Sequence, residues 1–194
     1  MIDDIYSHHV LNGIVANTVE EEGIEVEVGR TLLDSNGDID SECAVILKPD
    51  DYYSTRVMAR PPKSVDNVVV THDGDSYRVY VIELKSTKKV GRLSRAEIHE
   101  KFLTVVERFF SEDFPEIFMR DFDLADLALW LVCDPFGMKG KGVSQEVFDR
   151  KVKSCGLDAY ASMKPLSYKG KLRMIKPMLP PPVIEKHGCF TAPA

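Results

Sequence analysis

The stretch Ser64–Lys88, with the sequence SVDNVVVTHDGDSYRVYVIELKSTK, decides the fold. Two apolar runs flank a polar turn, which predicts a β-hairpin. Asp66, Glu83 and Lys85 interrupt these runs, and a charge inside an apolar strand is costly unless it is paired or holds a metal. Because side chains alternate between the two faces of a strand, Glu83 and Lys85 project together while Leu84 points into a core.

The length of the hairpin turn decides how Asp66 lies relative to Glu83. A four-residue loop over residues 73–76 places Asp66 directly opposite Glu83, whereas a two-residue turn over 73–74 places it opposite Val81, one diagonal step away. Both registers keep the acids on one face, and only an odd-length loop without a bulge would separate them. Directly opposed Cβ atoms are about 5 Å apart, a spacing at which two carboxylates can share one hard cation.

This trio of charges suits the hydrolysis of a phosphodiester bond. Mg²⁺ takes oxygen ligands at about 2.1 Å and keeps several waters, so two carboxylates can hold it beside a phosphate and an attacking water. The ion polarises the phosphoryl oxygen and lowers the pKa of its water. Lys85 is expected to stay protonated beside two carboxylates. It is therefore expected to orient the water or neutralise charge on the phosphate, not to act as a general base.

A lone aspartate, a gap and then Glu-x-Lys inside an apolar strand resembles the signature of the PD-(D/E)xK nucleases, the restriction-endonuclease-like superfamily. Asp66 matches the first acid, Glu83 the second and Lys85 the lysine, although Val65 stands where many members carry proline. The phrases VDN and IELKS look especially like those of type II restriction enzymes. The resemblance implies an α/β fold in which helices flank a mixed central sheet, in the order α–β–β–β–α–β. It also implies a metal site at Asp66, Glu83 and Leu84.

In function, the resemblance implies a Mg²⁺-dependent endonuclease that cuts double-stranded DNA, with Mn²⁺ as a substitute metal. It also implies a homodimer, because one site cuts one strand and two copies make a two-strand cut most simply. Two alternatives stay open: RNA or branched DNA as the substrate, and a nuclease-like binding module that has lost catalysis. The intact catalytic trio argues against the binding module.

Members of this superfamily often use a further acid from the first helix or an early strand. Residues 7–22 have helical apolar spacing, and Glu22 continues the apolar face of that predicted helix. Glu22 is therefore included among the catalytic residues. Glu21 and Glu42 are the competing choices.

The net charge of −6 is unevenly distributed along the chain. Residues 1–50 carry twelve acidic and two basic residues, whereas residues 139–194 carry eleven basic and four acidic ones. Phosphate contacts require a local basic surface and not a global excess of positive charge. Lys88, Lys89 and Arg92 follow the motif directly and are the predicted nucleic-acid contacts.

The remaining pattern predicts the elements around the hairpin. Ser94 and Glu97 form a capping box that opens a helix with an apolar face. Other elements are strands over residues 24–33, 43–48 and 127–133, a helix over 144–154, and an edge strand over 172–176. They predict one nuclease domain over residues 1–176 and a proline-rich tail over 177–194.

Length and composition fit a protein with one sizeable core, since the chain has 194 residues. Neither a membrane-spanning apolar stretch nor a basic-then-apolar signal sequence is visible, so the expected location is the cytoplasm, without a membrane partner. The four cysteines are widely spaced, without a C-x-x-C pair. This spacing favours reduced thiols over disulfides, zinc or an iron–sulfur cluster.

Overall fold

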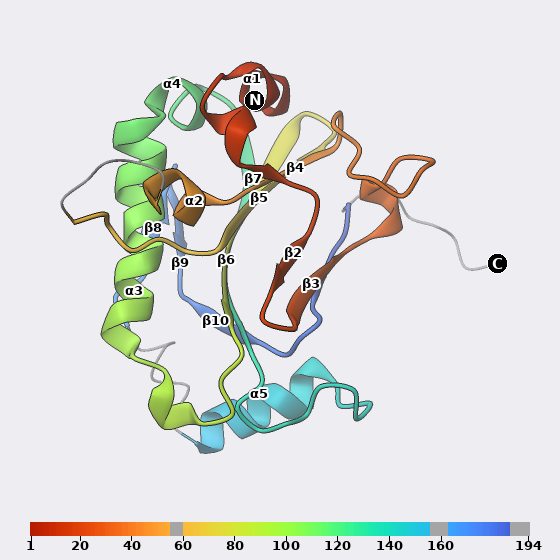
Figure 1. Cartoon of the computed structure of the whole chain (residues 1–194), viewed down its shortest axis with the longest axis vertical. Helices are drawn as coiled ribbons and strands as arrows, with labels where there is room; N and C mark the ends of the chain where they lie inside the picture. The colour runs from red at the N-terminus through yellow and green to blue at the C-terminus, as the bar shows by residue number, and fades with distance from the viewer. Residues whose placement is uncertain (55–59, 156–162, 187–194) are drawn as a thin grey trace.

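The computed structural model describes residues 1–54, 60–155 and 163–186. A six-stranded mixed sheet forms its centre, in the order β1-β4-β5-β6-β7-β10 (Figure 1). The bounds of these strands are Val15–Ala16 for β1, Ala44–Leu47 for β4, Asn67–Asp73 for β5, Ser76–Lys85 for β6, Asp123–Cys133 for β7 and Lys176–Met178 for β10. The chain is therefore a mixed α/β protein built on a mixed sheet.

Three consecutive strands, β4, β5 and β6, pair antiparallel, and β7 then pairs parallel with β6. A parallel neighbour needs a long crossover, which is supplied by α3 (Arg95–Leu103) and the π-helical segment η4 (Thr104–Asp113). Ser94 caps α3 by accepting a hydrogen bond from the backbone N–H of Glu97, as the capping box predicts. The crossover positions α3 against the end of β6 that carries the motif.

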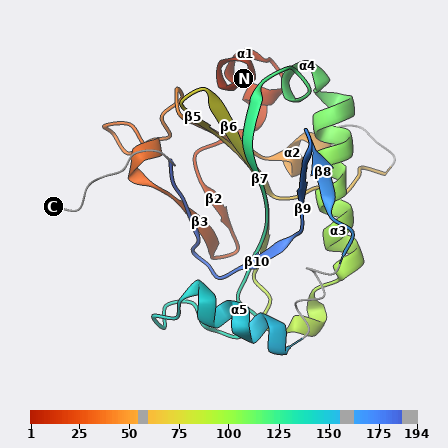
Figure 2. The same cartoon turned by 180° about the vertical axis from the view of Figure 1, so that it is seen from behind.

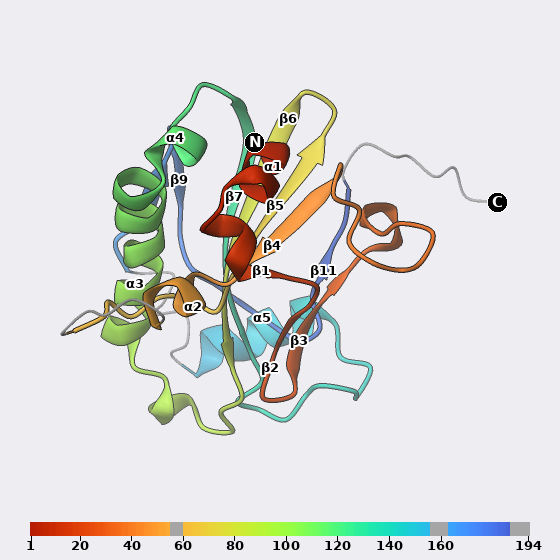
Figure 3. The ribbon, with the colours of Figure 1, turned by 45° about the horizontal axis from the view of Figure 1, so that its top comes forward.

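Helices cover one face of the central sheet, as Figures 1 and 3 show. They are α1 (Ile2–Ser7), α2 (Pro49–Ser54), α3 with η4, and α4 (Pro115–Phe118). The core on this face joins alternating strand residues, such as Val68 and Val81, to Phe102 and Phe109 of the crossover helix. Every second side chain of the strands and the apolar face of the crossover helix thus pack together in one layer.

The opposite face is covered by a three-stranded sheet of the order β11-β3-β2. Its strands are β2 (Val19–Glu21), β3 (Ile24–Val28) and β11 (Val183–Ile184), and they bury a second apolar cluster against the central sheet. The helix predicted over residues 7–22 is therefore wrong. After α1 and a 3₁₀ turn over Leu11–Ile14, β-branched Val15 and Val19 enter strands, because pairing with β4 and β3 outweighs their helical spacing.

The β5–β6 hairpin has the register predicted for a four-residue loop, in which His72 pairs with Tyr77. One further pair, Asp73 with Ser76, shortens the turn itself to residues 74–75. Gly74 adopts φ +64°, a left-handed conformation that glycine enters without steric cost. The alternative turn over residues 73–74 is wrong, and the register that aligns Asp66 with Glu83 is confirmed.

In the C-terminal third, the predicted helix is present, but the residues predicted as a tail enter strands. The helix α5 (Gln145–Ser154) begins after its cap Ser144 and agrees with the helix predicted over residues 144–154. In place of one edge strand, β8 (Leu166–Tyr168) pairs with β9 (Lys171–Arg173), and β10 follows beside β7 (Figure 2). Residues 177–184, expected as a tail, enter both sheets through β10 and β11. Residues 187–194 are not described.

Within the three described ranges, no helix is both long and apolar enough to span a membrane. Cys43, Cys133 and Cys155 are free thiols, and Cys189 lies in the part of the chain that is not described. Burial raises the pKa of the Cys133 thiol to about 12, so this cysteine behaves as a buried apolar side chain and not as a nucleophile.

Candidate active site

The hairpin register brings the two acids of the motif together. Asn67 pairs with Ile82, so Asp66 comes directly before β5 and in line with Glu83 near the end of β6. The backbone N–H of Leu84 donates a hydrogen bond of 2.6 Å to Asp66 Oδ2 and holds the Asp66 side chain in this position. Both acids lie on the sheet face that packs against the crossover helix, as the alternation of β6 predicts.

Glu83 is a fully buried carboxylate, with 0% of the residue exposed. Its Oε1 atom lies 2.7 Å from Lys85 Nζ and 2.7 Å from Lys101 Nζ. Lys101 Nζ is also 3.9 Å from Asp66 Oδ1. A buried charge is tolerated when it is paired and hydrogen-bonded, so the two lysines explain how Glu83 can sit inside the protein.

Lys101 is the site residue that the sequence reading missed. It lies on α3 between Ile98 and Phe102, which are only 2% and 0% exposed. Its position, three residues after Ile98 and four before Val105, places a lysine on the apolar face of the predicted helix. A charge on that face was the signal that could have identified it, by the same reasoning that singled out Asp66 and Glu83.

Lys85 is held in its protonated form by the acids around it. Burial by itself lowers the pKa of this lysine, but the charge and hydrogen bond of Glu83, together with the charges of Asp66 and Glu21, raise it above its ordinary value. The direction of this shift agrees with the expectation from the sequence. A permanently charged Lys85 can stabilise negative charge on a phosphate, whereas it has no free lone pair with which to take a proton.

Glu21, and not Glu22, is the upstream acid that contacts Asp66. Burial, together with the hydrogen bond and charge of Asp66, raises the pKa of Glu21 to about 7 against the opposing charges of Lys85 and Lys101. Burial and the charge of Glu83 likewise raise the pKa of Asp66. Although much of the Glu21 residue is exposed, its carboxyl group forms a hydrogen bond with Asp66, in which protonated Glu21 is the donor.

The two other candidate acids have different positions. Glu22 follows the end of β2 at φ +48°, and its carboxylate accepts a hydrogen bond from Ser86 Oγ at the mouth of the site. Glu42 is exposed just before β4. Because β4 runs antiparallel to β5, Asp66 lies beyond the far end of β4, past Leu47, and Glu42 cannot approach it.

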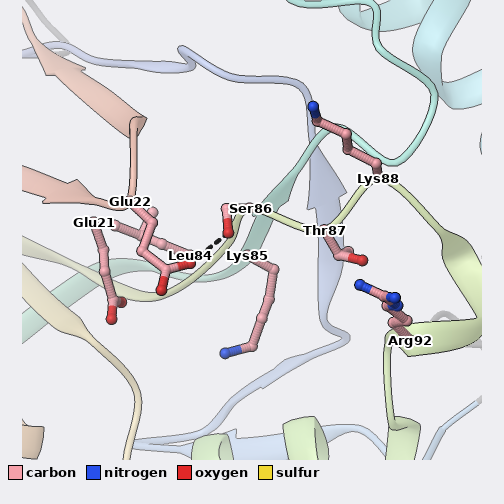
Figure 4. Close-up of a pocket in the computed structure, with 8 residues that line it drawn as sticks. All are labelled: Glu21, Glu22, Leu84, Lys85, Ser86, Thr87, Lys88 and Arg92. Carbon is pink, nitrogen blue, oxygen red and sulfur yellow. Dashed lines mark hydrogen bonds between the residues drawn. The ribbon is translucent and has the colours of Figure 1, made fainter.

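A cavity of about 420 Å³ opens beside Glu21 and Glu22. It is lined mainly by charged and hydroxyl side chains from the ends of β2 and β6 and from the residues that follow these strands, namely Glu21, Glu22, Leu84, Lys85, Ser86, Thr87, Lys88 and Arg92. Figure 4 shows Glu21 and Glu22 on one side and Arg92 on the other, with Lys85 reaching between them. Of the three predicted nucleic-acid contacts, Lys88 and Arg92 line this cavity, whereas Lys89 is exposed outside that lining.

The oxygen donors of the cluster are of the type that a hard cation binds, although the described residues do not form a ready-made metal site. Within the described ranges, no three Asp, Glu, His or Cys side chains are already arranged to hold a metal. Glu83 Oε2, however, is buried without a hydrogen-bond partner among these residues, and such an oxygen is costly unless a ligand satisfies it. Glu21, Asp66 and Glu83 supply carboxylates, while Leu84 could add only its backbone carbonyl because its side chain packs on the opposite face.

The raised pKa of Glu21 predicts a pH-dependent stability. Between its ordinary value of 4.5 and about 7, the folded protein keeps a proton that the unfolded chain releases, so this group lowers the free energy of unfolding as the pH rises. Glu21→Gln mimics the protonated acid. In EDTA, we expect its Tm to equal that of the wild type at about pH 5 and to exceed it by about 3 °C at about pH 8. The expected Tm shift is smaller than the value obtained by converting the whole pKa change into free energy of unfolding, because Glu21 is solvent-exposed.

Thermal unfolding followed by circular dichroism measures this difference, with Glu42→Gln as the matched control. The control also replaces an exposed glutamate by glutamine, but at a position that cannot approach Asp66. The difference in Tm between Glu42→Gln and the wild type should therefore be the same at both pH values. A Glu21→Gln difference that is the same at low and high pH would contradict the contact between Glu21 and Asp66.

The chain matches no protein-family model, no curated protein and no solved structure. The functional inferences below therefore depend on the geometry of the cluster and on the resemblance of its motif.

Proposed function

We propose that the chain is a metal-dependent endonuclease that hydrolyses phosphodiester bonds in double-stranded DNA. The observation that supports this most is the meeting of Asp66 and Glu83 at the end of the β5–β6 hairpin, with Lys85 bound to Glu83. Two carboxylates and a protonated lysine at one point suit a reaction in which a cation and a phosphate must be held together. The resemblance to PD-(D/E)xK nucleases assigns these same three residues.

The order of the elements also supports this proposal. The antiparallel strands β4, β5 and β6, the crossover α3 and the parallel strand β7 follow one another as the β–β–β–α–β part of the order that the resemblance implies. The first helix of that order is short here, and β2, β3 and β11 cover the second face of the sheet. A restriction-endonuclease-like core is therefore part of the proposal, with an unusual covering on one side.

Each residue of the cluster would have a defined task. Glu21, Asp66 and Glu83, with the carbonyl of Leu84, would hold Mg²⁺ or Mn²⁺, which when bound polarises a phosphoryl oxygen and acidifies a water. Lys85 would stabilise the negative charge that develops on the phosphorus oxygens. In this scheme no lysine acts as a general acid or base, which agrees with the raised pKa of Lys85.

The shape of the surface favours a polymeric substrate over a small phosphodiester. A second cavity, of about 460 Å³, shares Glu22, Ser86, Thr87 and Lys88 with the first and continues past the site as far as Lys139. Lys88 and Arg92 border this path on the side opposite the acids. Lysine and arginine side chains along a groove bind successive phosphates of a nucleic-acid strand.

Cleavage assays test this proposal. The protein is incubated with plasmid, linear duplex, branched DNA, single-stranded DNA and RNA, each with Mg²⁺, Mn²⁺, Ca²⁺ or EDTA. We expect duplex cutting in Mg²⁺ and Mn²⁺ and none in EDTA. Ca²⁺, which prefers longer bonds and looser geometry, should permit duplex binding with little cutting. Sedimentation in the presence of duplex tests the proposed homodimer, since two sites are needed for a two-strand cut.

Different results would change the proposal in different ways. Cutting confined to RNA or to branched DNA would keep the chemistry and change the substrate. Failure to bind any nucleic acid in Ca²⁺ at low and moderate salt would contradict the nuclease proposal and leave a catalytically inactive binding module in its place.

A further inference from the structure

A lysine occupies the place between the two motif acids where a cation would bind. Lys101 Nζ lies 2.7 Å from Glu83 Oε1 and 3.9 Å from Asp66 Oδ1, and its side chain is only 13% exposed. The ammonium group therefore bridges the carboxylate of Glu83 in β6 and that of Asp66, which directly precedes β5. A divalent ion shared by the same two oxygens would have to displace it.

The crossover helix holds Lys101 in this position. Its neighbours Ile98 and Phe102 are 2% and 0% exposed and belong to the main apolar core. Moving α3 away from the sheet would expose both side chains to water, at a cost that grows with the apolar area exposed. The stem of Lys101 is therefore fixed at its base, and its charge remains directed at the acids.

Two ammonium groups already neutralise the two motif acids. Asp66 and Glu83 are balanced by Lys85 and Lys101, and Glu21 adds one negative charge when it is ionised. A second divalent ion between Asp66 and Glu83 would place two more positive charges directly beside these ammonium groups. Like charges at such short range repel strongly in a partly buried site.

Donors for a single ion lie around another cavity beside Asp66, and Lys101 is not part of the lining of this cavity. Glu21 and Asp66 line this cavity, which has a volume of about 110 Å³. Asn67 also lines it, and the amide oxygen and nitrogen of this fully buried side chain have no hydrogen-bond partner among the described residues. Glu20, Asp50, Asp51 and Lys48 complete the lining. This cavity therefore combines several carboxylates and one lysine with an unsatisfied amide, and such oxygen-rich surroundings suit a hard cation.

We propose that Lys101 fills the second cation position, so that the active site takes a single divalent ion on the Glu21 side of Asp66, to which Glu83 would offer only its Oε2 atom because both lysines hold Oε1. This inference depends on the proposed metal-dependent function. Lys101 acts as a positioning residue: it holds Glu83 and supplies fixed positive charge where a second metal would otherwise bind.

The number of Mn²⁺ ions bound per chain, measured by electron paramagnetic resonance without substrate, tests this inference. We expect one ion for the wild type and two for Lys101→Met, which keeps the aliphatic stem but removes the charge. Lys101→Gln is the second variant, because it can still donate a hydrogen bond to Glu83 if the methionine variant fails to fold. Arg95→Met removes a positive charge from the exposed first turn of the same helix and should still bind one ion.

The outcomes separate this inference from the proposed function. Two ions on the wild type, or one ion on a folded Lys101→Met or Lys101→Gln variant, would overturn the role of Lys101 and leave metal-dependent cleavage standing. No ion bound by the wild type would contradict the proposed function itself and remove the basis of the inference.

Discussion

Asp66→Asn is expected to abolish duplex cleavage, with a rate loss of at least about 1,000-fold, or ~4 kcal/mol of transition-state stabilisation. The substitution removes one of the carboxylates proposed to hold the metal, but the asparagine oxygen can still accept the hydrogen bond from the Leu84 N–H that positions residue 66. The fold should therefore persist while the metal site is weakened. The rate is measured with Mg²⁺ on the duplex that the wild type cuts.

Two controls isolate the role of the Asp66 carboxylate. Asp38→Asn makes the same chemical change at an exposed acid in the turn before β4 and should keep wild-type activity. Mn²⁺ should raise the Tm of the wild type, since a ligand that binds only the folded state stabilises it, and it should raise the Tm of Asp66→Asn much less. Activity within about tenfold of the wild type, ~1.4 kcal/mol, would remove Asp66 from the catalytic set.

Phe109→Ala is expected to cause the largest loss of stability, about 3–5 kcal/mol in the free energy of unfolding. Phe109 is 0% exposed and its ring contacts those of Tyr52, Phe114 and Phe118. Truncation leaves a cavity where α2, η4 and α4 meet, because neighbouring rings relax only partly into such a space. Urea denaturation measures the change.

Met119→Ala is the comparison for Phe109→Ala, because Met119 follows α4 directly and is 46% exposed. Its loss should change the free energy of unfolding by less than about 0.5 kcal/mol, as is usual for a surface position. Equal effects of the two substitutions would contradict the central place of Phe109 in the helical layer.

The meeting of Asp66, Glu83 and Lys85 could be predicted from the sequence because its geometry is local. Glu83 and Lys85 are two residues apart in one strand, and the alternation of strand side chains fixes their common face whatever the rest of the fold does. Asp66 joins them through one hairpin, so only the length of a single turn had to be inferred. The crossover helix was equally accessible, because its capping box and apolar spacing are contained in residues 94–109.

The N-terminal segment was misjudged because its pattern fits two structures. Apolar residues four apart, such as Val15 and Val19, suit a helix face, but they also suit two short strands separated by a turn. Their β-branched side chains and the available edges of β4 and β3 decided for strands. The choice depends on a distant partner only for β1, which pairs with β4, whereas β2 pairs with the neighbouring strand β3. As a result Glu21, and not the predicted Glu22, contacts Asp66.

The sequence by itself determined that Asp66, Glu83 and Lys85 share one face of a hairpin, because the two-residue period and the turn register are local properties. Only the tertiary structure decided which other charges complete the cluster. Glu21 arrives on a small sheet that packs over one side, and Lys101 arrives on a helix that packs over the other. Their approach follows from the burial of two apolar layers, which no local spacing specifies.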